Sequence, residues 1–122
     1  MKYLNCSVLS APDTASQTSA AIDSQQLMGA SFHIHFGDST VAGSVKLQAS
    51  NDICATNYSA QYNFVPTNWV DIPSASVSIV AGAPELITLP NTSTMYRFMR
   101  VVFTYSSGGY TTINCNMFAM SM

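Results

Sequence analysis

Apolar and polar residues alternate with a period of two along most of this chain, and this pattern limits the possible folds more than any other feature. Side chains of a β-strand point alternately to its two faces, so each alternating segment predicts a half-buried strand. The apolar members are Phe32, Ile34 and Phe36; Val45, Leu47 and Ala49; Val77 and Ile79; and Ile113, Cys115, Met117 and Ala119. Only segment 20–28 tolerates a helical turn, which Asp23 or Ser24 would cap.

Turn-forming residues separate these segments at spacings of roughly ten residues. They occur at Gly37-Asp38-Ser39, Pro73-Ser74, Gly82-Ala83-Pro84, Pro90-Asn91-Thr92 and Ser106-Ser107-Gly108-Gly109, the last being the clearest hairpin signal. About seven or eight antiparallel strands are therefore expected, in an all-β sandwich or jelly roll. With 122 residues, we expect a single domain over 1–122. Segment 11–23 is expected to be a polar arm or loop, and 51–67 an aromatic insertion loop.

Charged residues make up only 8% of the chain, against about 25% in typical proteins. Four basic and six acidic residues give a net charge of -2. This excludes a basic stripe for nucleic acid and a polybasic membrane contact, and no apolar run is long enough for a transmembrane helix. An uncharged surface suits a protein covered by neighbouring subunits or one that meets sugars. Charged residues are depleted at interfaces, so we favour subunit contacts.

Three cysteines, Cys6, Cys54 and Cys115, occur without a C-x-x-C pair. We expect three free thiols, with a Cys6–Cys115 bridge between the terminal strands as the alternative. Residues 1–11 are expected to form the first strand and not a signal peptide, because polar residues interrupt their apolar run.

Candidate chemistry is sparse. His33 and His35 share one strand face but lack the further ligands of a metal site, and Asp38, Asp52 and Asp71 stand apart from one another. We expect these carboxylates to cap backbone amides in loops. No nucleophile motif is present, so we expect neither enzyme activity nor a cofactor.

Segment 96–105 is apolar on both faces, which predicts a central strand covered by a long loop or by another subunit. Arg100 shares a face with Phe98 and Val102 and needs a partner if it is buried. A carboxylate, backbone carbonyls at a subunit contact or an anchoring role in the core remain open for it. The aromatic 51–67 loop either folds over the core or contacts a partner, and we favour the partner.

Three segments carry a resemblance to a known family. They are Val45-Lys46-Leu47-Gln48-Ala49-Ser50-Asn51-Asp52, Asn68-Trp69-Val70-Asp71-Ile72-Pro73 and Tyr96-Arg97-Phe98-Met99-Arg100-Val101-Val102-Phe103-Thr104. With Ser107-Gly108-Gly109 and a closing strand, they resemble small discoidin-like β-sandwich proteins encoded by bacteriophages, over roughly 21–120. The chain departs from that family in its 53–67 insertion.

The resemblance implies a non-enzymatic virion protein, made in the bacterial cytoplasm: a capsid decoration or cement protein, or part of a tail, spike or fibre. Its expected partners are phage capsid or tail proteins and further copies of itself, a trimer being favoured. The alternative is a carbohydrate-binding receptor-recognition module of a tail fibre or spike. The residues expected to contact a partner are Tyr58, Tyr62, Phe64, Trp69, Arg97 and Arg100.

Overall fold

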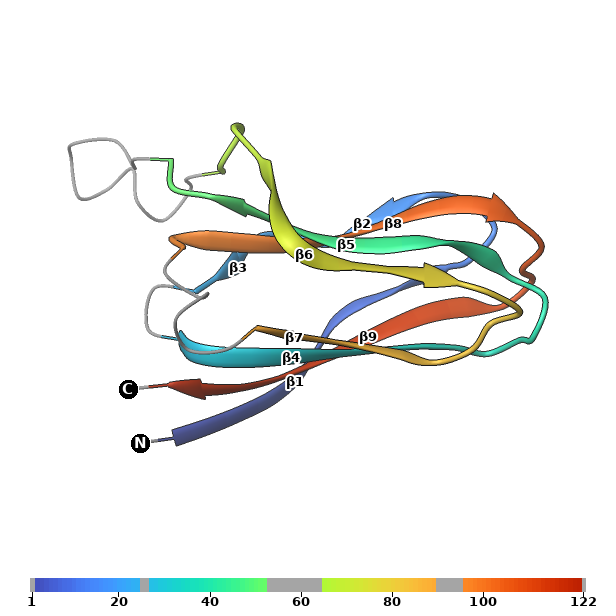
Figure 1. The fold of residues 1–122 in the computed structure, drawn as a ribbon, viewed down its shortest axis with the longest axis horizontal. Coiled ribbons are helices and arrows are strands. Elements are labelled where there is room, and N and C mark those ends of the chain that lie inside the picture. The colour runs from blue at the N-terminus through green and yellow to red at the C-terminus, as the bar shows by residue number, and fades with distance from the viewer. Residues whose placement is uncertain (1, 25–26, 53–64, 90–95, 122) are drawn as a thin grey trace.

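A computed structural model describes residues 2–24, 27–52, 65–89 and 96–121. These residues form two antiparallel sheets packed face to face, which confirms the predicted all-β sandwich (Figure 1). The strands are β1 (Lys2–Pro12), β2 (Gln17–Thr18), β3 (Ile22–Asp23), β4 (Leu27–Phe36), β5 (Ala42–Ser50), β6 (Val70–Ile79), β7 (Glu85–Leu89), β8 (Phe98–Ser107) and β9 (Thr112–Ser121). No helix in the described part of the chain is long and apolar enough to cross a membrane.

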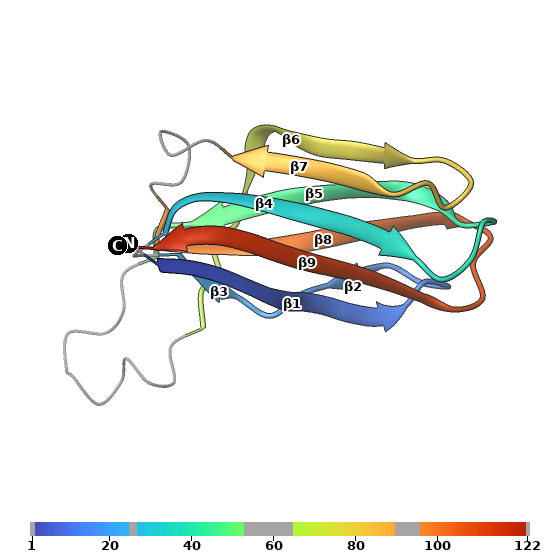
Figure 2. The same cartoon turned by 90° about the horizontal axis from the view of Figure 1, so that it is seen from below.

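The strand order is that of a jelly roll. Sheet A has the order β1-β9-β4-β7, and sheet B has the order β2-β8-β5-β6, with β3 pairing with β8 beyond β2. Consecutive strands cross from one sheet to the other except at β2–β3 and β5–β6, so the two sheets interleave along the chain (Figure 2). The terminal strands β1 and β9 pair, which brings the two ends of the chain together.

The core lies between the sheets and consists of the inward members of the alternating segments. Phe32, Ile34, Val45 and Leu47 are fully buried, as is Ile113. Strand β8 lies between β5 and the β2–β3 edge, which confirms its central position. Its Met99, Val101 and Phe103 face the core with no exposed area.

The N-terminal third differs from expectation. Segment 20–28, which tolerates a helical turn, contains strand β3 (Ile22–Asp23) and the start of β4 at Leu27, and its residues 25–26 lie outside the described residues. Segment 11–23, expected as a polar arm or loop, contains the end of β1 together with β2 and β3. Ser19 holds this segment to β8: its N–H donates to the Val101 carbonyl at 2.9 Å, and its Oγ accepts the Val101 N–H at 2.9 Å.

The turn predicted at Pro73-Ser74 is also wrong, because β6 continues through it. The register moves from Lys46↔Ser76 to Gln48↔Asp71, so β6 has extra residues that bulge out at this point. Within the bulge, Ser74 adopts the left-handed conformation, with a φ of 61°. The turn predicted at 90–92 lies outside the described residues.

Candidate functional site

The outer face of sheet A carries no charged residue at its described positions. The residues in register across it are Tyr3, Asn5, Ser7 and Ser10 on β1; Asn114, Asn116, Phe118 and Met120 on β9; Gly29, Ser31, His33 and His35 on β4; and Leu86 and Thr88 on β7. None is Asp, Glu, Lys or Arg. The six acidic and four basic residues of the chain lie elsewhere, on sheet B, in loops or at the ends of β1 and β7.

Large apolar side chains are exposed on this uncharged face. The rings of Tyr3 and Phe118 stack with their centroids 5.6 Å apart and their planes 11° from parallel. Tyr3 is 65% exposed, Phe118 48% and Leu86 63%. A shallow groove of about 290 Å³ begins at the stacked pair and continues over Ser31 to Thr88. The face therefore combines apolar area with hydrogen-bonding groups that carry no charge.

His33 and His35 lie side by side on the same face, with ring centroids 5.2 Å apart. The Asn116 amide nitrogen lies 3.3 Å from Nε2 of His35. Among the described residues, no group of three or more His, Cys, Asp or Glu residues is placed to hold a metal ion. The two imidazoles thus belong to the polar part of the face.

Strand β1 forms one edge of sheet A. It is 11 residues long and, within the described chain, pairs with β9 along one side only. Its other side presents backbone N–H and C=O groups without a neighbouring strand (Figure 2). Such an edge can take up a strand from another chain.

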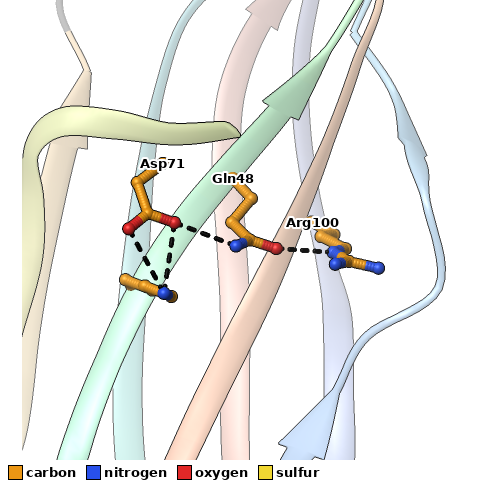
Figure 3. Close-up of polar contacts among 4 residues, drawn as sticks. Gln48, Asp71 and Arg100 are labelled. Carbon is orange, nitrogen blue, oxygen red and sulfur yellow. Dashed lines mark hydrogen bonds and ion pairs between the residues drawn. The ribbon is translucent and has the colours of Figure 1, made fainter. Parts of the chain in front are cut away.

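Sheet B has an outer face of a different character. A line of polar side chains crosses β6, β5 and β8 (Figure 3). Gln48 lies in the middle: its amide Nε2 donates to Asp71 at 2.9 Å, and its Oε1 accepts from Nε of Arg100 at 2.8 Å. Lys46 forms an ion pair with Asp71 at 3.1 Å. The hydrogen bond from Gln48, followed by that from Lys46, holds the pKa of Asp71 below its usual range.

Trp69 and Arg100 meet on this face. The guanidinium carbon of Arg100 lies 4.3 Å from the centroid of the Trp69 ring. The indole N–H donates to the Pro66 carbonyl at 3.2 Å, which fixes the ring over the sheet. Within the described chain Arg100 is therefore partnered by an amide and an aromatic ring, and not by a carboxylate or a core position. Its contact with another subunit stays a prediction.

Arg97 lies on the same side of the molecule. It forms an ion pair with Asp23 at 2.6 Å, and its guanidinium carbon lies 4.2 Å from the centroid of the Phe98 ring. Of the six predicted contact residues, the structure thus brings Trp69, Arg97 and Arg100 to sheet B. Tyr58, Tyr62 and Phe64 lie outside the described residues.

Asp52 connects the end of β5 to the residues just before Trp69. Its Oδ2 accepts the N–H groups of Thr67 and Asn68 at 2.7 and 2.9 Å, and its Oδ1 accepts from the Asn68 amide at 2.9 Å. These hydrogen bonds, the Asn68 N–H first, hold the pKa of Asp52 below its usual range. The prediction that loop carboxylates cap backbone amides is confirmed for Asp52 and for Asp38. It is wrong for Asp71, which lies in β6 and accepts from the side chains of Lys46 and Gln48.

Beside Asp52 lies a groove of about 380 Å³ that sequence reasoning missed. Its lining comes from the end of β5, the start of β6 and Tyr96: Ala49, Ser50, Asn51, Asn68, Val70, Asp71, Ile72, Pro73 and Tyr96. Residues of the β6 bulge line one side of the groove. In the sequence, Pro73-Ser74 is the signal that could have indicated this bulge.

The thiols of Cys6 and Cys115 are free. In the β1–β9 ladder Cys6 is opposite Met117, and Cys115 is opposite Leu9. The alternative of a bridge between them is therefore wrong. Burial raises the pKa of the Cys115 thiol to about 12, so it is an inert core residue. Cys54 lies outside the described residues.

No protein-family model matches the chain, and no curated protein sequence matches it. Several solved structures share its fold. The PBSX exported protein XepA superposes with a TM-score of 0.65 at 11% identity, over 98% of this chain. This chain spans only 37% of XepA. The SPBc2 prophage-derived protein YomS superposes with a TM-score of 0.56 at 10% identity, over 98% of this chain and 94% of YomS.

A chitosan-binding module of a chitosanase/glucanase from Paenibacillus sp. IK-5 also shares the fold. It has a TM-score of 0.50 and 19% identity, over 88% of this chain and 71% of the module. Identities this low establish a common β-sandwich and nothing finer. The sandwich thus occurs in an exported protein, in a prophage-derived protein and in a chitosan-binding module, while the narrower discoidin-like assignment stays a prediction.

Proposed function

We propose that this chain is a non-enzymatic structural protein of a bacteriophage particle, acting as a capsid decoration protein. In this proposal it binds capsid or tail proteins and further copies of itself, with the trimer as the favoured assembly. The observation that carries the proposal is the absence of charge from the described outer face of sheet A.

Burying a charge at an interface is costly unless a partner neutralises it. None of the ten charged residues of this chain lies on the outer face of sheet A. That face can therefore be buried against a partner without the cost of desolvating a charge. Tyr3, Phe118 and Leu86 supply exposed apolar area there. The free side of β1 adds backbone hydrogen-bonding groups at the margin of the face.

Further support is of a general kind. Jelly rolls recur in viral capsid proteins and in lectins. One of the solved structures with this fold, YomS, is named as a prophage-derived protein. The segments quoted above resemble phage-encoded sandwich proteins.

The test places one charge on the uncharged face, at strand β7 on the edge of sheet A. Leu86→Lys changes a side chain that is 63% exposed, so the stability of the isolated fold should change by no more than about 0.5 kcal/mol. We expect the unaltered chain to sediment as an oligomer or to bind purified capsids, and Leu86→Lys to lose both properties. Thr104→Lys, at an exposed position of β8 in sheet B, is the matched control and should retain both. An unaltered chain that stays monomeric and ignores capsids would contradict the proposal.

A second candidate function is receptor recognition through a carbohydrate. The observation that favours it is the polar line of Asp71, Gln48 and Arg100 beside the Trp69 ring and the 380 Å³ groove. Planar polar groups and an aromatic ring together suit the hydroxyls and the apolar face of a sugar. Trp69 is the single tryptophan, so its fluorescence reports binding directly. We expect chitosan or neutral oligosaccharides to quench the Trp69 fluorescence saturably, and Arg100→Ala to abolish this quenching. A Trp69 emission that these sugars leave unchanged would exclude this candidate.

A further inference from the structure

Three connections meet at the end of the sandwich opposite the chain termini (Figure 1). Asp13 follows β1, Asp38 lies between β4 and β5, and Thr111 lies between β8 and β9. Asp13 and Thr111 bond to each other twice: the Asp13 N–H donates to the Thr111 carbonyl at 3.3 Å, and the Thr111 N–H donates to Oδ1 of Asp13 at 3.0 Å. The Thr111 hydroxyl donates to Oδ2 of Asp38 at 3.0 Å. Two carboxyl groups therefore hold residues that are about a hundred positions apart in sequence, with Thr111 between them.

The two carboxyl groups have different surroundings. Asp38 accepts hydrogen bonds on both oxygens: from the N–H and hydroxyl of Thr40 at 3.0 and 2.9 Å, and from the Tyr110 N–H at 3.2 Å besides Thr111. Asp13 has no exposed area, and its Oδ2 has no protein partner that donates to it. A buried carboxylate oxygen without a donor is strongly unfavourable, whereas the same oxygen carrying a proton becomes a donor itself.

The natural acceptor for such a proton is the Asp38 carboxylate, which forms a side-chain hydrogen bond with Asp13 and shares Thr111 as a neighbour. We propose that Asp13 and Asp38 form a carboxyl–carboxylate pair that shares one proton, with Asp13 the protonated member, and that this pair locks the three connections together. Loss of the proton leaves two negative charges in contact at a buried site and loosens this end of the sandwich.

A cation is a poorer occupant than a proton. The N–H and O–H groups of Thr40, Tyr110 and Thr111 already turn their positive ends toward Asp38. A calcium ion needs six or more oxygen ligands, and no cluster of three metal-binding side chains lies here in the described chain.

The remaining neighbours add no charge to the pair. The β6–β7 turn approaches Asp38 through Gly82, and the β8–β9 turn approaches Asp13 through Gly109, neither of which titrates. Tyr110 contributes its backbone N–H, and its side chain is 70% exposed. Asp13 and Asp38 are therefore the titrating groups at this site among the described residues.

The pair makes stability depend on pH in a definite direction. Burial, followed by the hydrogen bond to Asp38, raises the pKa of Asp13 above its usual value. The stabilisation from its proton is complete below the unfolded-state pKa of about 3.9 and is lost as pH rises through the raised pKa of Asp13. Asp52 behaves in the opposite way, because its pKa is lowered: its stabilisation is present above about pH 4 and is lost in stronger acid.

The experiment measures thermal unfolding of the full chain from pH 4 to pH 8. Asp13→Asn supplies a permanent N–H donor toward Asp38 and keeps an acceptor for the Thr111 N–H. We expect this variant to melt above the unaltered chain at pH 8, by on the order of 3–6 °C, and to lose the decline in melting temperature between pH 4 and pH 8. Asp52→Asn, the matched control, should melt lower at pH 8 and keep the decline.

A second measurement does not depend on the variant folding. In the unaltered chain, the carboxyl carbon of Asp13 should titrate above about 3.9 in an NMR experiment, while Asp38 stays ionised. An Asp13 that titrates at or below that value would overturn the proposal, as would an Asp13→Asn variant that is folded but less stable at every pH. A melting temperature that millimolar Ca²⁺ raises in the unaltered chain and not in Asp13→Asn would show a cation in place of the proton.

Discussion

Arg100 joins two parts of sheet B through two different contacts of one side chain. Its guanidinium lies over the Trp69 ring while its Nε donates to Oε1 of Gln48. A guanidinium can do both at once because it is planar and carries several N–H groups in fixed directions. The residue therefore fixes the segment before β6 to the middle of sheet B.

Arg100→Lys tests this role while keeping the charge. A lysine ammonium can approach the ring or the amide but cannot stack as a plane, so the free energy of unfolding should fall by about 0.5–1 kcal/mol. Trp69 should become more exposed, and its fluorescence emission should shift to longer wavelength. Arg97→Lys is the control, since Arg97 stacks on Phe98 and should leave the Trp69 emission unchanged. An unshifted emission in Arg100→Lys would contradict the stacked arrangement.

Contacts between residues that border the same loop could be predicted from the sequence, and contacts between residues far apart in the chain could not. Asp52 was predictable as a loop cap because its donors, Thr67 and Asn68, border the same loop. The contact of Trp69 with Arg100 was not predictable, because it depends on the pairing of β6 with β5 and of β5 with β8. Asp13 was missed for the same reason: its burial comes from Thr111, which no local pattern connects to it.

At the scale of strands, period-two alternation identified the long strands because one face of each is buried over many residues. Strands β2 and β3 have two residues each, too few to show a period, and backbone pairing with β8 stabilises them instead. The sequence predicts a turn at Pro73-Ser74, which would split β6 into two strands. This prediction was wrong because a Pro-Ser pair suits a bulge within a strand as well as a turn.

The β8–β9 turn was predicted from its glycines, and Gly108 explains why. Its φ is 73°, in the left-handed region, and an added Cβ would collide with the Thr40 carbonyl oxygen. Gly108→Ala should lower the free energy of unfolding by at least about 1–2 kcal/mol, measured by chemical denaturation. Ser107→Ala, at the preceding exposed position, should change it by less than about 0.5 kcal/mol. Equal stabilities for the two variants would mean that the turn adopts another conformation.

At the scale of the whole molecule, the two sheets differ in charge. Sheet B carries Lys46, Asp71, Arg97 and Arg100 on its outer side, and the described outer face of sheet A carries no charge. Alternation predicts which residues face outward, but not which outward faces belong to one sheet, since that depends on the jelly-roll strand order. The low number of charged residues was visible in the sequence. That the outer face of sheet A lacks them altogether at its described positions was not.

This difference makes the proposed assembly testable with salt. At about 1 M NaCl the Debye length is about 3 Å, so contacts between charged groups weaken while apolar contacts do not. An assembly through sheet A should keep its sedimentation coefficient as NaCl is raised from low concentration to 1 M, because Tyr3, Phe118 and Leu86 contribute apolar area without charge. Leu86→Lys should sediment as a monomer throughout that range. Dissociation of the unaltered assembly by salt would instead assign the contact to the charged outer face of sheet B.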